Sequence, residues 1–201
     1  MSRPTEVPVI PVQVLMAAYA EGRFPMAHAD GELYWHDPDP RAVFDLDALR
    51  PNARLARLMR NAGFHVTRDE AFTSVVDACA ERPETWIDAR IRATYAQLHR
   101  AGHAHSVEVW SMDDRGALML VGGIYGVALG GAFFGESLFH RVPNAGKVAF
   151  HALAEHLRRC GFTLFDSQYL NPFTARLGAV EVPRARFLRM LAAAKQVPAC
   201  F

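Results

Sequence analysis

Three strand-like segments follow one another between residues 105 and 139, and they constrain the fold more than any other part of the chain. HSVEVWS alternates polar and apolar residues, DDRG is typical of a turn, and ALMLVGGIYGVALGG and AFFGESLF have the composition of two further strands. Consecutive strands joined by connections this short pair antiparallel. The segment therefore predicts an antiparallel meander.

Helical patterns lie on both sides of the meander along the chain. They cover residues 12–24 with Gly22 as the C-terminal signal, 52–62, 69–80, 88–100 and 144–160. The strand FTLFD follows, and Pro172 and Pro183 stand where further helices are expected to begin. This order of elements predicts an α+β fold, with an antiparallel-rich sheet flanked by helices.

The segment 24–44 is rich in Pro, Asp and Gly, which predicts a loop-rich connector and a domain boundary near residue 40. We therefore expect a small N-terminal domain over residues 1–40 and a larger domain over residues 41–201.

Composition excludes several classes of protein. Hydrophobic residues make up 51% of the chain and charged residues 21%, so a sizeable core can form, and no apolar run is long enough to cross a membrane. The N-terminal residues lack the features of a signal peptide, and the three widely spaced cysteines fit reduced thiols. No Cys or His spacing matches a zinc site. We expect a cytoplasmic monomer without a metal.

Basic residues are distributed unevenly, although the net charge is only +1. Between Asp47 and Asp69 there is no acidic residue, and the helix at 52–62 carries three arginines on the side opposite its apolar face. We call them the arginine face: Arg54, Arg57 and Arg60. It is either an ordinary solvated helix face or a surface that follows phosphates.

Two polar sites interrupt the apolar strands. Glu136 lies inside GAFFGESLFHR, and Asp166 and Gln168 follow the strand FTLF directly. An ionised carboxylate out of water costs several kcal/mol unless it is paired, so these side chains need specific partners. If the two strands are neighbours, the three polar groups converge on a pocket walled by Phe133, Ile124, Phe165 and Leu153. The alternative is local: Asp166 caps a turn and Gln168 bonds to the backbone.

Other catalytic motifs fit the sequence poorly. Ser137, His140 and Asp166 could form a triad, but GESLF lacks the G-x-S-x-G spacing of a nucleophile elbow. VGGIYGVALGG lacks the glycine spacing of a dinucleotide fingerprint. VPNAGKVAF, at the start of the helix after residue 143, is a weak candidate for the pyrophosphate cradle of an acyl-CoA enzyme.

Seven segments together resemble the bacterial leucyl/phenylalanyl-tRNA–protein transferases. They occur in the family's order over about residues 14–190, and the most specific are HAHSVEVW, the GES segment and the D-x-Q-x-x-N segment. The full set is LMAAYAEGRFPM, YWHDPDPRAVF, ETWID, GHAHSVEVW, VGGIYGVALG, FFGESLFHRVPNAGKVA and DSQYLNPFTARLGAVEVPR.

The resemblance implies a catalytic domain similar to the GNAT acyltransferase fold and a defined reaction. The family transfers Leu or Phe, and less readily Met, from aminoacyl-tRNA to proteins with N-terminal Lys or Arg, and the product is an N-degron. It uses neither acetyl-CoA nor metal, so we expect no cofactor. A tRNA-binding module of transferase ancestry with weak or lost catalysis is the alternative.

The resemblance also implies roles for individual residues. Asp166 would help to withdraw a proton, Gln168 would orient the substrate, and Glu136 would order polar groups at the aminoacyl end. Trp86 and Tyr95 would contact the aminoacyl-adenosine. The remaining substrate-binding positions would be Ile124, Phe133, Ser137, Leu153, Leu157, Phe165 and Asn171. The arginine face would bind the acceptor stem of the tRNA.

Such an enzyme needs no nucleophile of its own, because an aminoacyl ester is already activated. It must bring an amine and an ester carbonyl together, remove a proton from the amine and stabilise the developing oxyanion. A pocket of aliphatic and aromatic side chains favours Leu and Phe only modestly, since one methylene is worth about 1–3 kcal/mol of discrimination.

Overall fold

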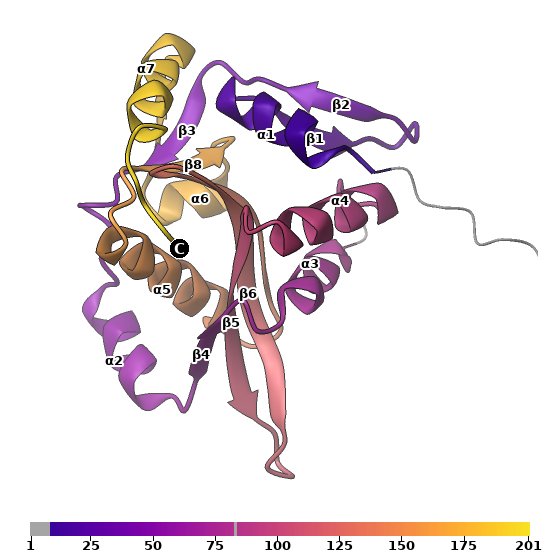
Figure 1. Cartoon of the computed structure of the whole chain (residues 1–201). Coiled ribbons are helices and arrows are strands. Elements are labelled where there is room, and N and C mark those ends of the chain that lie inside the picture. The colour runs from indigo at the N-terminus through magenta and orange to yellow at the C-terminus, as the bar shows by residue number, and fades with distance from the viewer. Residues whose placement is uncertain (1–8, 83) are drawn as a thin grey trace, which may run out of the picture.

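A mixed sheet of seven strands organises the chain in the computed structural model, which describes residues 9–82 and 84–201 (Figure 1). The strand order is β4-β5-β6-β7-β8-β3-β9, in which β7 and β8 are parallel and the other neighbours antiparallel. The strands are β3 Arg41–Phe44, β4 His65–Arg68, β5 Ala104–Met112, β6 Leu118–Leu129, β7 Ala132–His140, β8 Leu164–Gln168 and β9 Ala179–Val182. The predicted α+β class is confirmed.

The predicted meander is the centre of this sheet. Strands β5, β6 and β7 pair in sequence order, with Val107 opposite Ile124 and Ile124 opposite Leu138. Neighbouring side chains on a strand point to opposite faces, so Phe133 and Phe134 belong to different hydrophobic clusters. Each face of the sheet therefore has its own apolar layer and its own helices.

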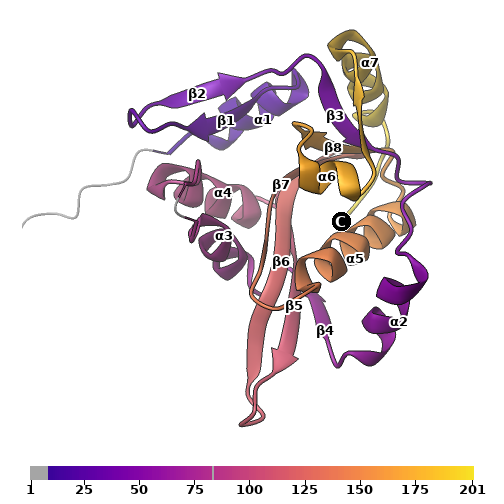
Figure 2. The same cartoon turned by 180° about the vertical axis from the view of Figure 1, so that it is seen from behind.

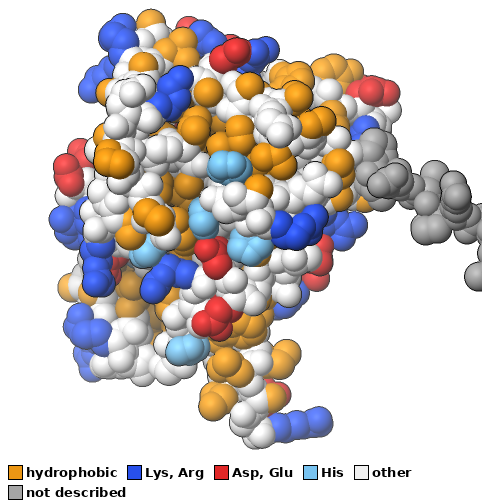
Figure 3. All heavy atoms as spheres, in the orientation of Figure 1, with side chains coloured by type: hydrophobic (Ala, Val, Ile, Leu, Met, Phe, Trp, Pro, Cys, Tyr) orange, Lys and Arg blue, Asp and Glu red, His pale blue; other side chains and the backbone are white. Residues whose placement is uncertain are grey.

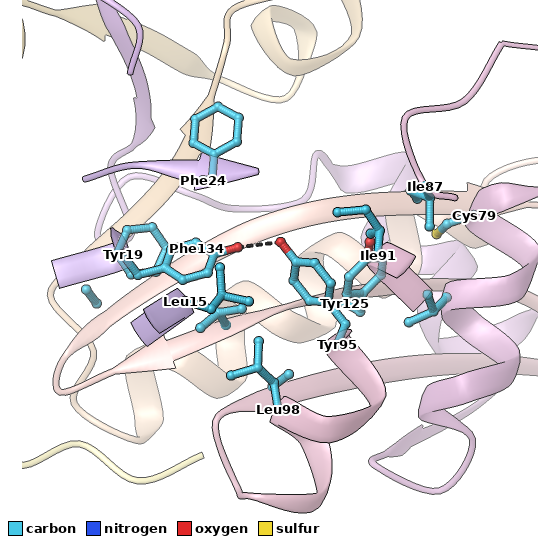
Figure 4. Packing of buried hydrophobic residues seen from close by; sticks show 14 of the residues in the cluster. Leu15, Tyr19, Phe24, Cys79, Ile87, Ile91, Tyr95, Leu98, Tyr125 and Phe134 are labelled. Atoms are coloured by element: carbon cyan, nitrogen blue, oxygen red, sulfur yellow. Dashed lines mark hydrogen bonds between the residues drawn. The ribbon is translucent and has the colours of Figure 1, made fainter. Parts of the chain in front are cut away.

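The helices form two layers on the sheet (Figures 1 and 2). Helices α1, α3, α4 and α7 contribute to the cluster on one face, and α2 and α5 contribute to the cluster on the other. Figure 4 shows side chains of the first cluster, in which Tyr19, Tyr95 and Tyr125 meet at its centre. The helices are α1 Val12–Ala20, α2 Ala53–Asn61, α3 Phe72–Ala80, α4 Ala89–Arg100, α5 Ala145–Arg159, α6 Pro172–Arg176 and α7 Arg184–Ala194.

The segment expected to be a loop-rich connector contains regular structure. Strands β1 (Phe24–Ala27) and β2 (Leu33–His36) form a separate two-stranded antiparallel sheet, and β3 then enters the large sheet between β8 and β9. The expectation of a loop was wrong because strands of four residues carry little local pattern, and their partners supply the stability. The boundary near residue 40 stays a prediction.

Local signals explain where several helices begin. The side chain of Asn52 accepts a hydrogen bond from Leu55 N at the start of α2, and Asp88 does the same for Ile91 N at the start of α4. Pro172 occupies the first turn of α6, as predicted. None of the helices in the described part of the chain is long and apolar enough to cross a membrane.

Candidate active site

A pocket opens where the parallel pairing of β7 and β8 ends. The two strands are in register from Ala132 and Leu164 to Phe134 and Asp166. Beyond these residues both strands continue into the lining of a cavity of about 240 Å³. Its lining from the two strands is Gly135, Glu136, Ser137 and Leu138 on β7, and Phe165, Asp166, Ser167 and Gln168 on β8, followed by Tyr169. The sheet therefore holds two carboxylates and an amide at one opening.

Glu136 is buried in a network of three donors, with 7% of its surface exposed. Its Oε1 accepts hydrogen bonds from Tyr19 Oη at 2.7 Å and from Gln168 Nε2 at 2.9 Å. Its Oε2 lies 3.0 Å from Tyr95 Oη. The two tyrosine oxygens are 2.5 Å apart, and the dashed line in Figure 4 marks this bond.

Burial raises the pKa of Glu136 to about 7, and the hydrogen bonds from Tyr19, Gln168 and Tyr95 only partly offset this effect. The charge of Asp166 adds to the increase. Burial and the nearby Glu136 also raise the pKa values of Tyr19 and Tyr95 well above their ordinary value, so both phenols keep their protons. Glu136 is thus an acid that exchanges its proton near neutral pH.

The hydrogen bonds around Glu136 depend on its protonation state. Three oxygen–oxygen contacts join Tyr19, Tyr95 and the carboxyl group of Glu136 in a ring, and the two phenols supply only two hydrogens. With Glu136 ionised, one contact has no hydrogen and must lengthen. With Glu136 protonated, its O–H donates to Tyr95, Tyr95 donates to Tyr19, and Tyr19 donates back to the carboxyl group. The longest of the three contacts, 3.0 Å between Tyr95 Oη and Glu136 Oε2, is the one whose hydrogen depends on the protonation state of Glu136.

Asp166 is held in a different way, by an ion pair with Arg41. Nε and Nη2 of Arg41 donate to the two carboxylate oxygens at 2.9 and 2.6 Å, and neither side chain is more than 1% exposed. Arg41 also donates to the carbonyl oxygen of Gly22 at 2.8 Å, and its guanidinium lies between the rings of Phe24 and Phe187. The pair therefore ties the turn after α1 to the end of β8.

Gln168 connects the two acids. Its backbone N–H donates to Asp166 Oδ1 at 2.9 Å, and its side-chain amide donates to Glu136. Its φ of 64° lies in the left-handed region, which is strained for a residue with a side chain. These two hydrogen bonds hold the amide at the pocket despite the strain. The two interpretations of this segment are therefore compatible, because Asp166 supports a local turn and also takes part in the polar network.

Most of the predicted site residues surround the pocket. Glu136, Asp166 and Gln168 converge as expected. Five of the predicted substrate-binding residues also line the cavity: Trp86, Ile124, Ser137, Phe165 and Asn171. Their contact with a substrate stays a prediction.

Four predicted positions lie elsewhere. Phe133 is fully buried among Phe162, Phe165 and Phe201, on the face covered by α5. Leu153 and Leu157 are buried in the same cluster, because α5 runs away from the pocket and only Phe150, nearer its start, lines the cavity. Tyr95 lies fully buried behind Glu136, so it offers no ring to a ligand. Phe133, Leu153 and Leu157 therefore do not line this cavity as expected, and Tyr95 does not present its ring to it; contact of these four residues with a substrate stays a prediction.

Two residues at the edges of the site have clear local roles. Asn171 caps α6: its Oδ1 accepts from the backbone N–H groups of Phe173 and Thr174 at 2.9 and 3.0 Å. The three residues of the arginine face are exposed on α2, outside the pocket, and basic side chains are visible over this helix in Figure 3.

Tyr19 and Arg41 were missed by the sequence analysis. Tyr19 looked like one apolar residue in a helix, and Arg41 stood in a segment that suggested a loop. Their partners are 117 and 125 residues away, so no local spacing marks them. The only signal was the position of Arg41 directly before the apolar run AVF.

A cluster of metal ligands is absent from the described part of the chain. No group of three or more His, Cys, Asp or Glu side chains in residues 9–82 and 84–201 could hold a metal ion. The chemistry available is proton exchange at Glu136, hydrogen bonding by Gln168 and an apolar wall that includes Phe44, Phe150 and Phe165.

Comparisons with known proteins point to one family. The family model described as leucyl/phenylalanyl-tRNA protein transferase matches residues 43–192, and the model of that family's N-terminal domain matches residues 10–39. The relatives named leucyl/phenylalanyl-tRNA–protein transferase include one from Ruegeria pomeroyi, 48% identical over 90% of this chain and 85% of its own. One from Gloeobacter violaceus is 47% identical over 94% of this chain and 96% of its own.

Among solved structures, that of FemX is similar in fold. The TM-score is 0.52 at 11% identity, over 88% of this chain and 70% of FemX, which supports the expected GNAT-like arrangement and concerns the fold alone. The sequence matches, in contrast, cover both parts of the chain at close to half identity. The chain belongs to the leucyl/phenylalanyl-tRNA–protein transferase family.

Proposed function

We propose that the chain transfers leucine or phenylalanine, and less readily methionine, from aminoacyl-tRNA to proteins that begin with Lys or Arg. Membership of the family supports transfer from tRNA to a protein. The product would carry an N-degron, and the reaction would take place in the cytoplasm. The observation that carries the proposal is Glu136, an acid that exchanges its proton near neutral pH and lies at the floor of a largely apolar pocket.

The pocket suits one amino-acid side chain. Its volume of about 240 Å³ is below the roughly 300–1,000 Å³ of typical small-molecule sites, so the nucleoside would lie at its mouth. Met26 from β1 and Trp86 from the segment before α4 also line the cavity. A largely apolar pocket of this kind accepts Leu and Phe, and it leaves Met as a weaker substrate because single methylenes are poorly discriminated.

Glu136 and Asp166 have different roles in the proposed reaction. The neutral amine attacks the ester carbonyl carbon, the C–N bond forms, and the nitrogen must lose a proton before the C–O bond to the ribose breaks. Glu136 accepts this proton, which completes its hydrogen-bond ring, and then gives it to the ribose oxygen that leaves. The amide oxygen of Gln168 accepts a hydrogen bond from the amine. Asp166 positions Gln168 and takes no proton, since Arg41 already binds both of its oxygens.

The test supplies Leu-tRNA or Phe-tRNA together with a peptide that begins with Arg or Lys. The expected product is a peptide one residue longer, detected by mass spectrometry, with slower extension from Met-tRNA. Equal extension of a matched peptide that begins with Glu would refute the acceptor specificity. Binding of tRNA without any extension would refute the transferase and favour the tRNA-binding module.

A further inference from the structure

A second cavity, rich in basic side chains, adjoins the proposed active site. It has a volume of about 660 Å³ and lies between the start of α2, the end of β7, the start of α5 and α6. We call it the basic cavity. Its lining is Arg50, Asn52, Leu55, His140, Asn144, Gly146, Lys147, His151, Phe173, Arg176 and Leu177. Phe173 and Leu177 also line the first pocket, so the two cavities share a wall.

The charge of the basic cavity is not a consequence of composition. The chain has 22 Lys and Arg against 21 Asp and Glu, yet the lining contains two arginines, one lysine, two histidines and no carboxylate. Within the described residues, no acid lies at salt-bridge distance from Arg50, Lys147 or Arg176. Burial, together with the positive charges of Arg158 and Lys147, lowers the pKa of His151. The described residues therefore provide no carboxylate to neutralise the side chains of the basic cavity, and the cavity is suited to binding an anion.

The backbone at this place is fixed by close packing. A side chain on Gly122 would collide with Ala145, and one on Gly146 would collide with Leu138, so the start of α5 lies directly on the sheet. The first-turn N–H groups of a helix carry partial positive charge and point outwards along its axis. The start of α5 therefore adds its dipole to the charges of the side chains.

We propose that the basic cavity binds phosphodiester groups of the unpaired 3′ end of the donor tRNA. This inference rests on the proposed function, because the aminoacyl ester in the first pocket belongs to a terminal ribose whose 5′ oxygen carries a phosphodiester. The strand must leave the pocket towards a neighbouring surface. The basic cavity adjoins the pocket and has no carboxylate in its lining, whereas a further cavity that shares Leu138 and Phe173 with the pocket includes Glu81. Arg50 and Asn52 place it beside the start of α2, the helix that carries the arginine face.

The proposal predicts different effects on two aminoacyl donors. Phenylalanyl-tRNA carries the phosphates, whereas phenylalanyl-adenosine presents the same ester without any. The double variant Lys147→Ala/Arg176→Ala is expected to raise KM for phenylalanyl-tRNA at least tenfold, to reduce the salt dependence of binding by one to two counterions, and to leave KM for phenylalanyl-adenosine unchanged. The matched control is Arg186→Ala/Arg189→Ala, which removes two exposed arginines of α7 outside both cavities.

Other outcomes have separate meanings. An equal loss with both donors, or no loss with either, would overturn the basic cavity as a phosphate site. If the parent chain used neither donor, the proposed function would fail. The cavity would then be tested by binding of the trinucleotide CCA, for which the same double variant is expected to bind at least tenfold more weakly than the parent. Unchanged trinucleotide binding would refute the inference.

Discussion

Replacing Glu136 with Gln tests the central feature of the site, because it keeps the shape of the side chain and removes its proton exchange. Every hydrogen bond can be kept: the amide oxygen of Gln accepts from Tyr19 and Gln168, its NH₂ group donates to Tyr95, and Tyr95 donates to Tyr19. The variant therefore reproduces the protonated acid at every pH. Its fold is expected to be intact.

The expected effect on stability follows from the pKa of Glu136. This acid titrates at 4.5 when unperturbed and at about 7 in the folded chain, a difference that corresponds to about 3 kcal/mol. Below pH 4.5 the acid is neutral in both states and costs nothing. As pH rises towards 7, the unfolded chain ionises freely and the folded chain does not, so the folded parent loses stability. Above pH 7 the folded parent is destabilised by the full amount of about 3 kcal/mol.

Glu136→Gln is therefore expected to be about as stable as the parent at pH 4.5 and more stable by up to about 3 kcal/mol at pH 8. Urea unfolding of both proteins at pH 4.5, 6, 7 and 8 measures this difference. The nine histidines titrate in the same range, but they are common to both proteins and their contributions cancel. A difference that does not change between pH 4.5 and 8 would refute the reasoning.

The same substitution is expected to reduce activity while stability rises. Loss of a positioned proton acceptor costs about 10²–10⁴ in rate. In the parent, kcat/KM is expected to increase with pH through about 7, where Glu136 ionises, and this step should be absent from the variant. A variant with the parent's rate and pH profile would exclude Glu136 as the proton acceptor. The opposite signs of the two effects distinguish lost chemistry from general damage.

Three further changes test the neighbouring structure. Asp166→Ala leaves the buried Arg41 without its partner, and we expect the free energy of unfolding in urea to fall by about 3–5 kcal/mol. Adding Arg41→Met to the same chain is expected to recover most of this loss. A loss below 1 kcal/mol would contradict the pairing. Asn171→Ala is expected to cost about 0.5–2 kcal/mol through the cap of α6, whereas Asn171→Asp keeps both stability and activity; equal damage by both would point to substrate contact instead. Replacing the arginine face with alanines is expected to weaken tRNA binding and to lower its salt dependence. If the dependence of tRNA affinity on salt concentration did not change, the arginine face would be an ordinary solvated helix face.

Sequence patterns were sufficient to predict strands that pair with their nearest neighbours along the chain. The alternation in HSVEVWS and the glycine-spaced runs that follow predicted β5, β6 and β7, because antiparallel strands joined by short turns pair with their nearest neighbours. The patterns failed for β3, β4 and β9, each four residues long. Strand β3 pairs with β8 and β9, more than a hundred residues away, and no local periodicity encodes such a contact.

The same limit applies to the site. Glu136 and Asp166 were recognisable because a charge in an apolar strand needs a partner, wherever that partner lies. The partners themselves were not recognisable: Tyr19 has the spacing of an ordinary core residue, and Arg41 follows a Pro-rich segment. Phe133 and Leu153 were placed in the pocket because apolar residues near a site are ambiguous between wall and core. Phe133 lies on the same face of the sheet as Ile124 and Phe165, which do line the cavity, so only the positions along β7 and α5 separate wall from core.

The site depends on placing two carboxylates in opposite environments on adjacent strands. Asp166 has a cation on both oxygens, so a proton there would displace a hydrogen bond of Arg41 and leave a buried positive charge. Glu136 has only neutral donors, and one of them, the Tyr95 hydroxyl, can reverse direction when the proton arrives or leaves. An acid that must accept and return a proton in each turnover needs partners of the second kind. The ion pair instead fixes the backbone from which Gln168 reaches Glu136, and for this reason we assign proton transfer to Glu136 and positioning to Asp166.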